Sequence, residues 1–196
     1  MGAELHGEAR HDNVLDDWRG FVSGGRAAWY LVPGDRWRFV TSATFSGAWR
    51  ARVPIQLALG ERDGGLRGYL GAREGGSGRL AGRAESRHVL GRLGNVGDLG
   101  VAAFVEAGKL WAGDAPYGVT TPVRTAVGVG ALGAFPRGSR RLWRGDVAKP
   151  LTRVPGAPAV AVIFENRDLT RLFWREPRDL QFGRERALPE NVFSWP

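Results

Sequence analysis

The segment from Arg79 to Val89 alternates between two kinds of side chain, and this alternation restricts what the chain can fold into. One side of an extended backbone would carry Arg79, Ala81, Arg83, Glu85 and Arg87. The other side would carry the uncharged residues Leu80, Gly82, Ala84 and Ser86. Successive side chains of a β-strand point to opposite faces, so the segment predicts a strand. Its charged face must contact either water or paired charges.

The rest of the chain repeats this pattern in short segments separated by Gly, Pro, Asp and Asn, and helical periodicity is almost absent. We expect about eight strands: Leu5–His11, Phe21–Val32, Arg36–Trp49, Arg79–Val89, Leu99–Trp111, Val123–Ala134, Arg140–Leu151 and Ala157–Phe173. The sequence therefore predicts an all-β antiparallel meander over residues 1–173. A polar loop is expected at 12–20, a long glycine-rich loop at about 59–78, and a charged tail at 174–196.

Composition excludes some classes of protein. The 196 residues include no cysteine, which excludes a disulfide framework and a cysteine zinc site. A formal net charge of +8 suggests nucleic acid as a partner, but the arginines are dispersed along the chain. Arginines and aromatic residues also segregate to opposite strand faces, whereas a nucleic-acid surface combines the two. We expect no nucleic acid, and keep a soluble basic nucleic-acid-binding protein as an alternative.

No catalytic constellation is visible. The histidines His6, His11 and His88 are far apart in the sequence, and Asp16-Asp17 is a lone acidic pair in a polar segment. The serines that fall in strands lack a nucleophile-elbow motif: Ser42, Ser46 and Ser86. The sequence predicts no enzyme, no metal and no cofactor.

Two architectures share this strand pattern: a soluble sandwich or barrel with a filled core, and a transmembrane barrel that is apolar outside and polar inside. Aromatic residues recur near strand ends, as at the interfaces of a membrane barrel: Trp29, Tyr30, Trp37, Trp49, Trp111 and Trp143. A soluble core accommodates the same residues, so the pattern leaves both architectures open. No stretch is long and apolar enough for a spanning helix.

The glycine-rich stretch Gly64–Tyr69 places Arg67 between glycines that permit a tight turn. Arginine is always charged and offers five donors in a rigid fork, which suits a partly buried carboxylate. By itself the stretch is either a solvated hairpin tip or a loop that carries one guanidinium to a specific partner.

A series of local patterns in a fixed order resembles one family. Leu66-Arg67-Gly68-Tyr69 resembles the [VL]-R-G-[FY] motif in the sixth extracellular loop of BamA-like outer-membrane barrels, whose barrel is also described as bacterial surface antigen. Ala84–Arg87 resembles the family's A-E-x-R strand, and Phe104–Gly108 resembles its F-x-D-x-G strand with Glu in place of Asp. Val127–Gly130 and Arg144–Leu151 resemble the last two strand motifs, G-x-G and R-x-D-x-A-x-P-L.

The resemblance implies a latch between loop and lumen. In the family the loop arginine meets the acidic residue of F-x-D-x-G, which here implies a pair between Arg67 and Glu106. Phe104, Glu106 and Gly108 share a strand face, and Gly108 leaves room for the loop. Asp146 is a second possible partner of Arg67, although Arg144 is on the same face. The implied latch residues are Arg67, Gly68, Tyr69, Phe104, Glu106, Gly108 and Asp146.

The resemblance also implies a cellular location and a function. It implies an integral protein of the bacterial outer membrane that acts in protein insertion or protein transport, with lipid, lipopolysaccharide and unfolded or exported client polypeptides as partners. A family barrel has about sixteen strands, roughly twice this chain, so we expect the C-terminal half of a transmembrane barrel and a fragment, split product or truncated chain. A patatin-like phospholipase carrying this barrel remains an alternative parent.

Overall fold

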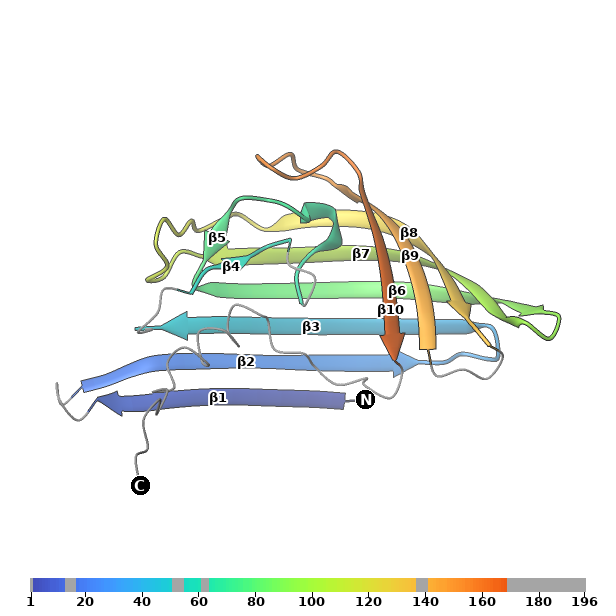
Figure 1. Ribbon diagram of the computed structural model, residues 1–196, viewed down its shortest axis with the longest axis horizontal. Helices are drawn as coiled ribbons and strands as arrows, with labels where there is room; N and C mark the ends of the chain where they lie inside the picture. The colour runs from blue at the N-terminus through green and yellow to red at the C-terminus, as the bar shows by residue number, and fades with distance from the viewer. Residues whose placement is uncertain (1, 13–16, 51–54, 61–63, 137–140, 169–196) are drawn as a thin grey trace, which may run out of the picture.

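Eight strands form one antiparallel sheet, and each of them pairs with the next strand of this sheet along the chain. The computed structural model describes residues 2–12, 17–50, 55–60, 64–136 and 141–168. The sheet consists of β1 (Gly2–Asp12), β2 (Asp17–Leu31), β3 (Trp37–Trp49), β6 (Gly78–Leu93), β7 (Gly97–Trp111), β8 (Arg124–Ala134), β9 (Arg141–Pro150) and β10 (Ala161–Asp168), in this order. Figure 1 shows β1, β2, β3, β6 and β7 side by side, whereas β9 and β10 run across their direction. Among the described strands, β1 and β10 are the two edges.

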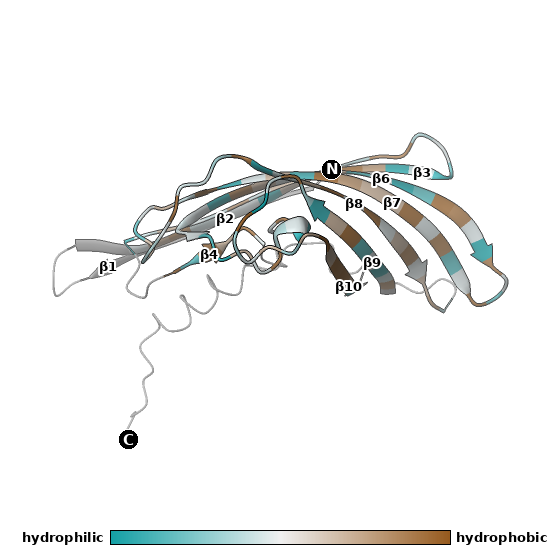
Figure 2. Ribbon diagram, turned by 90° about the horizontal axis from the view of Figure 1, so that it is seen from above, coloured by the Kyte–Doolittle hydropathy of each residue, from teal (hydrophilic) through white to brown (hydrophobic). Residues whose placement is uncertain are grey.

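The segment between β3 and β6 folds back over the sheet. It contains the two-residue strands β4 (Leu57–Ala58) and β5 (Gly75–Gly76), which pair with each other, and the short 3-10 helix η1 (Arg67–Tyr69). Figure 2 shows the sheet as an arc with η1 on its inner side. We call this inner side the concave face and the opposite side the convex face.

The connections differ between the two ends of the strands. One end carries the segments 32–36, 94–96 and 135–140, and we call it the short-turn rim. The other end carries 13–16, 50–77, 112–123 and 151–160, and we call it the long-loop rim.

Burial is reversed relative to a water-soluble sheet. Large apolar side chains on the convex face are exposed, among them Val105 (47%), Val129 (59%) and Phe164 (81%). Charged side chains on the concave face are buried, among them Glu85, Glu106 and Asp146. Period-two alternation therefore separates apolar from charged residues, but the charged face is the one that is covered.

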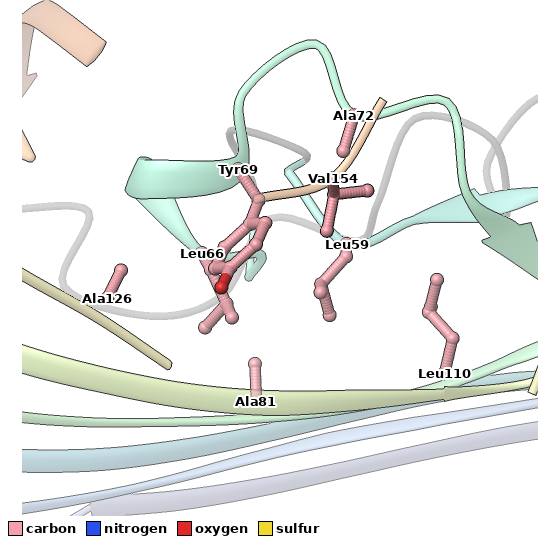
Figure 3. Close-up of a cluster of buried hydrophobic side chains, with 8 residues drawn as sticks. All are labelled: Leu59, Leu66, Tyr69, Ala72, Ala81, Leu110, Ala126 and Val154. Carbon is pink, nitrogen blue, oxygen red and sulfur yellow. The ribbon is translucent and has the colours of Figure 1, made fainter. Parts of the chain in front are cut away.

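Apolar residues of the inserted segment cover part of the concave face. The largest buried cluster joins segment, strands and the loop before β10, as Figure 3 shows: Leu59, Leu66, Tyr69, Ala72, Ala81, Leu110, Ala126 and Val154. A second cluster packs Ile55 and Leu57 against Val22 and Ala48. The chain thus supplies its own apolar cover for the inside of the sheet.

The prediction of an all-β antiparallel meander is confirmed, and several boundaries were wrong. Residues 12 and 17–20 were expected in a loop, yet β1 reaches Asp12 and β2 begins at Asp17, because backbone pairing between these residues continues the ladder despite their polarity. β6 continues to Leu93, past an irregularity between Val89 and Gly91 that realigns it with β7. β10 begins at Ala161, after a turn in which Gly156 has a φ of 85°. The expected tail at 174–196 lies outside the described residues.

Candidate functional site

The site lies on the concave face, where three strands present carboxylates to the η1 turn. In the register of the sheet Arg83 of β6 is opposite Glu106 of β7, and Glu85 is opposite Phe104. Asp146 comes from β9. These carboxylates are almost fully buried, with at most 1% of each side chain exposed.

Arg67 enters this site from the start of η1. Its backbone N–H donates a hydrogen bond to Glu106 Oε2 at 2.7 Å. Its guanidinium Nη1 lies 3.0 Å from Asp146 Oδ2 and 3.8 Å from Glu85 Oε2, while Nε lies 3.7 Å from Glu106 Oε1. None of the three side-chain nitrogens makes a well-oriented hydrogen bond among the described residues. The guanidinium is therefore held by ion pairing with three carboxylates rather than by one bidentate pair.

Three other arginines complete the neutralisation of the carboxylates. Arg144 Nε donates to both oxygens of Asp146 at 2.8 and 2.7 Å, and its Nη1 donates to Glu85 Oε1 at 2.7 Å. Arg83 Nε donates to Glu106 Oε1 at 2.5 Å, and Arg87 pairs with Glu85. We call the eight residues of this group the ionic cluster: Arg67, Arg83, Glu85, Arg87, Phe104, Glu106, Arg144 and Asp146.

Phe104 forms the floor under two of the guanidinium groups. The guanidinium carbon of Arg67 lies 4.5 Å from the ring centroid, and that of Arg144 lies 5.7 Å from it. An arginine above an aromatic face gains cation–π attraction, which is larger when water is excluded. The ring occupies the space above Gly128, where a Cβ would overlap its Cζ.

Two further glycines allow the loop to approach the strands. A Cβ at Gly68 would lie 2.6 Å from Cβ of Ala126. A Cβ at Gly108 would lie 2.9 Å from the Leu80 carbonyl oxygen and 3.3 Å from side chains of Leu59 and Leu66. Any larger residue at either position would push the inserted segment away from the sheet.

Tyr69 fixes the other end of η1. Its hydroxyl donates to the Thr125 carbonyl oxygen at 3.0 Å and accepts from the Thr152 backbone N–H at 3.3 Å. The tyrosine thereby joins the loop to the start of β8 and to the segment after β9.

The charges of the cluster nearly balance. Four arginines face three carboxylates, so the net charge is +4 − 3 = +1. Among the described residues no group of three or more His, Cys, Asp or Glu side chains could hold a metal ion. In the same residues no helix is long and apolar enough to cross a membrane. The arrangement can hold a loop in place by electrostatics.

The structure brings all seven sequence-predicted site residues to one place, but it changes the nearest partner of Arg67. Glu106, the expected partner, accepts from the Arg67 backbone and from Arg83, while the guanidinium lies closest to Asp146, the second candidate. Sequence reasoning did not assign Glu85 to the site. The signal was the charged face of the segment 79–89, whose only carboxylate is Glu85.

Comparison with known proteins gives no relative from which to argue. No protein-family model, no curated protein and no solved structure matches the chain.

Replacing Arg67 by alanine should destabilise the protein by about 3 to 5 kcal/mol, because three buried carboxylates lose a counter-charge. Arg67→Lys should recover part of the loss, since it keeps the charge but loses the contact with Phe104. Unfolding of the refolded protein by denaturant measures both. Arg36→Ala removes an exposed arginine from a turn and should change little. Equal unfolding free energies for Arg67→Ala and the native chain would contradict a role in holding the loop.

Replacing Gly128 by alanine should cost about 1 to 3 kcal/mol, because the new methyl group competes with the Phe104 ring and with the Val147 carbonyl oxygen. Gly82→Ala is the matched control, since its Cβ would meet only ordinary contacts at 3.9 and 4.0 Å. That control should be neutral or slightly stabilising, because glycine is unfavourable within a strand. A loss of stability of the same size in both variants would show that the close contact between Gly128 and the Phe104 ring is not its cause.

Proposed function

We propose that this chain is the C-terminal part of a BamA-like outer-membrane barrel, whose convex face contacts lipid and which acts in the insertion or export of client polypeptides. The observation that carries the membrane part is the reversed burial, with apolar residues exposed and an ionic cluster covered. In water this pattern would expose a large apolar surface, whereas in a bilayer it is the expected one.

Aromatic residues support two membrane interfaces. Trp29, Trp37 and Trp143 lie toward the short-turn rim and are 44%, 45% and 51% exposed. Trp49 and Trp111 end their strands at the long-loop rim and are 60% and 41% exposed. Two girdles of this kind border the apolar band of a transmembrane barrel.

The different lengths of the connections at the two rims support one orientation of the chain in the membrane. Bacterial barrels have short periplasmic turns and longer extracellular loops. The short-turn rim would then face the periplasm, and the segment that carries Arg67 would enter the lumen from outside.

The open edges support a larger barrel. Unpaired backbone groups are not tolerated at membrane depth, so β1 and β10 would pair with further strands. The motif resemblance suggests about sixteen strands, and the task of client insertion comes from that resemblance. In this proposal Arg67 holds the loop inside the lumen and braces the strands around it.

A charge in the middle of the convex face distinguishes lipid from water. Val129 lies near the middle of β8 and is exposed. Its replacement by lysine should destabilise a lipid-embedded sheet by about 2 to 4 kcal/mol. In a soluble protein the same exposed position would tolerate lysine within about 0.5 kcal/mol. Leu151→Lys, 58% exposed in a loop at the rim, is the control and should be tolerated in both cases. Unfolding in vesicles gives the measurement, and native, monodisperse protein without detergent would refute the membrane assignment.

Client insertion is tested in proteoliposomes. Vesicles that contain the whole barrel of which this chain forms the C-terminal part should make an unfolded outer-membrane protein resistant to protease faster than empty vesicles do. Arg67→Ala should lose most of this acceleration because the loop is no longer held, whereas Arg36→Ala should retain it. Equal rates in loaded and empty vesicles would refute the insertion activity and leave the membrane assignment intact.

A further inference from the structure

Two arginines on the concave face share too little negative charge. Arg38 of β3 is directly opposite Arg87 of β6 in the register of the sheet. Like charges directly opposite each other on one face of a sheet repel. Arg38 is exposed, and among the described residues no carboxylate forms an ion pair with it. Arg87 pairs with Glu85, but that carboxylate has two further arginine partners in the ionic cluster. The two arginines therefore carry an excess of positive charge.

The other charged residues in this part of the molecule occur in pairs of opposite sign. The short-turn halves of β1, β2, β3, β6 and β7, with the turns that join them, comprise residues 2–6, 25–43 and 85–104. Apart from Arg38, Glu85 and Arg87, these ranges contain three pairs of charged residues, two set by the register and one by adjacency in a turn: Glu4 with Arg26, Arg92 with Asp98, and Asp35 with Arg36. The excess charge of Arg38 and Arg87 is thus not offset by neighbouring positions.

The inserted segment does not cover this part of the concave face. It packs on β2 and β3 at Val22 and Ala48, which lie toward the long-loop rim. Tyr30 lies at the opposite end of β2, where the register places it on the concave face, and it is 45% exposed. The Arg87 side chain is 26% exposed. We call Tyr30, Arg38 and Arg87 the basic surface, and it is accessible from the short-turn rim.

The chemistry of the basic surface suits carboxylates. Guanidinium groups bind carboxylates through parallel N–H donors, and a tyrosine hydroxyl beside them can donate a further hydrogen bond. In the orientation proposed above, the short-turn rim faces the periplasm, from which a client polypeptide would enter, and the anions of a polypeptide are its carboxylates. We propose that the basic surface binds an acidic segment of a client polypeptide at the periplasmic side of the lumen. The inference rests on the proposed function and adds a substrate class to it, namely clients with clustered Asp or Glu residues.

The experiment uses the full chain purified in detergent and measures the binding of labelled peptides by fluorescence anisotropy. One peptide alternates glutamate with threonine, and its control has glutamine in place of each glutamate. The native chain should bind the acidic peptide more tightly than the control, and added salt should weaken this binding. Arg38→Gln should bind the acidic peptide about 2 to 5 times more weakly, the effect of one exposed ion pair. Arg38→Glu should lose more, because attraction becomes repulsion, whereas Arg38→Lys should retain most of the binding.

Arg153→Gln is the matched control, since it removes one exposed arginine at the long-loop rim, away from the basic surface. It should bind like the native chain, and an equal loss in this variant would assign the binding to overall charge and overturn the proposal. Displacement of the peptide by millimolar phosphate at constant ionic strength would show a free-anion site and overturn the polypeptide ligand. Tighter binding of a single-stranded oligonucleotide would overturn it in favour of nucleic acid. Equal binding of the two peptides would overturn this inference alone, whereas the membrane assignment depends on the lysine substitution at Val129.

Discussion

Neutralisation of buried charge around Phe104 is the interaction on which the inserted loop depends. Moving an isolated charge out of water costs several kcal/mol, and only close counter-charges recover that cost. Arg67 meets carboxylates from β6, β7 and β9, and each of these carboxylates has a second arginine partner. The loop can therefore enter the concave face only when three strands are in register. Conversely, the carboxylates are better neutralised when the loop is present.

Geometry makes this charge pairing compatible with close packing. The ionic cluster lies beside an apolar cluster, so Leu66 and Tyr69, which flank the Arg67-Gly68 pair, exclude water from one side of the ions. Glycines at 68, 108 and 128 remove the side chains that would otherwise separate loop, strands and ring. Small residues and charged residues thus act together. The glycines let the loop approach the strands closely, and the opposite charges make this close approach energetically favourable.

The sequence predicted the strands well because their alternation is local. The faces of the segment 79–89 and the presence of Arg67 at a loop tip followed directly from neighbouring residues. The nearest partner of Arg67 did not, because it depends on how β6, β7 and β9 are staggered across the sheet. The hairpin at 12–17 was missed for a related reason: pairing of Asp12 with Asp17 is a property of two strands, whereas the polarity of these residues favoured a loop.

The ionic cluster and η1 together brace the strands from β6 to β10. Ionic contacts reach β6, β7 and β9, and η1 itself touches β8, β9 and β10. β2 meets the inserted segment through apolar packing of Val22 near Ile55 and Leu57, and the Gly20 N–H donates a hydrogen bond to the Arg50 carbonyl oxygen at 2.7 Å. Apolar packing is non-directional, whereas paired charges fix orientation. In the proposed barrel the paired charges therefore fix the loop relative to β6, β7 and β9, and the contacts of η1 extend this support to β8 and β10.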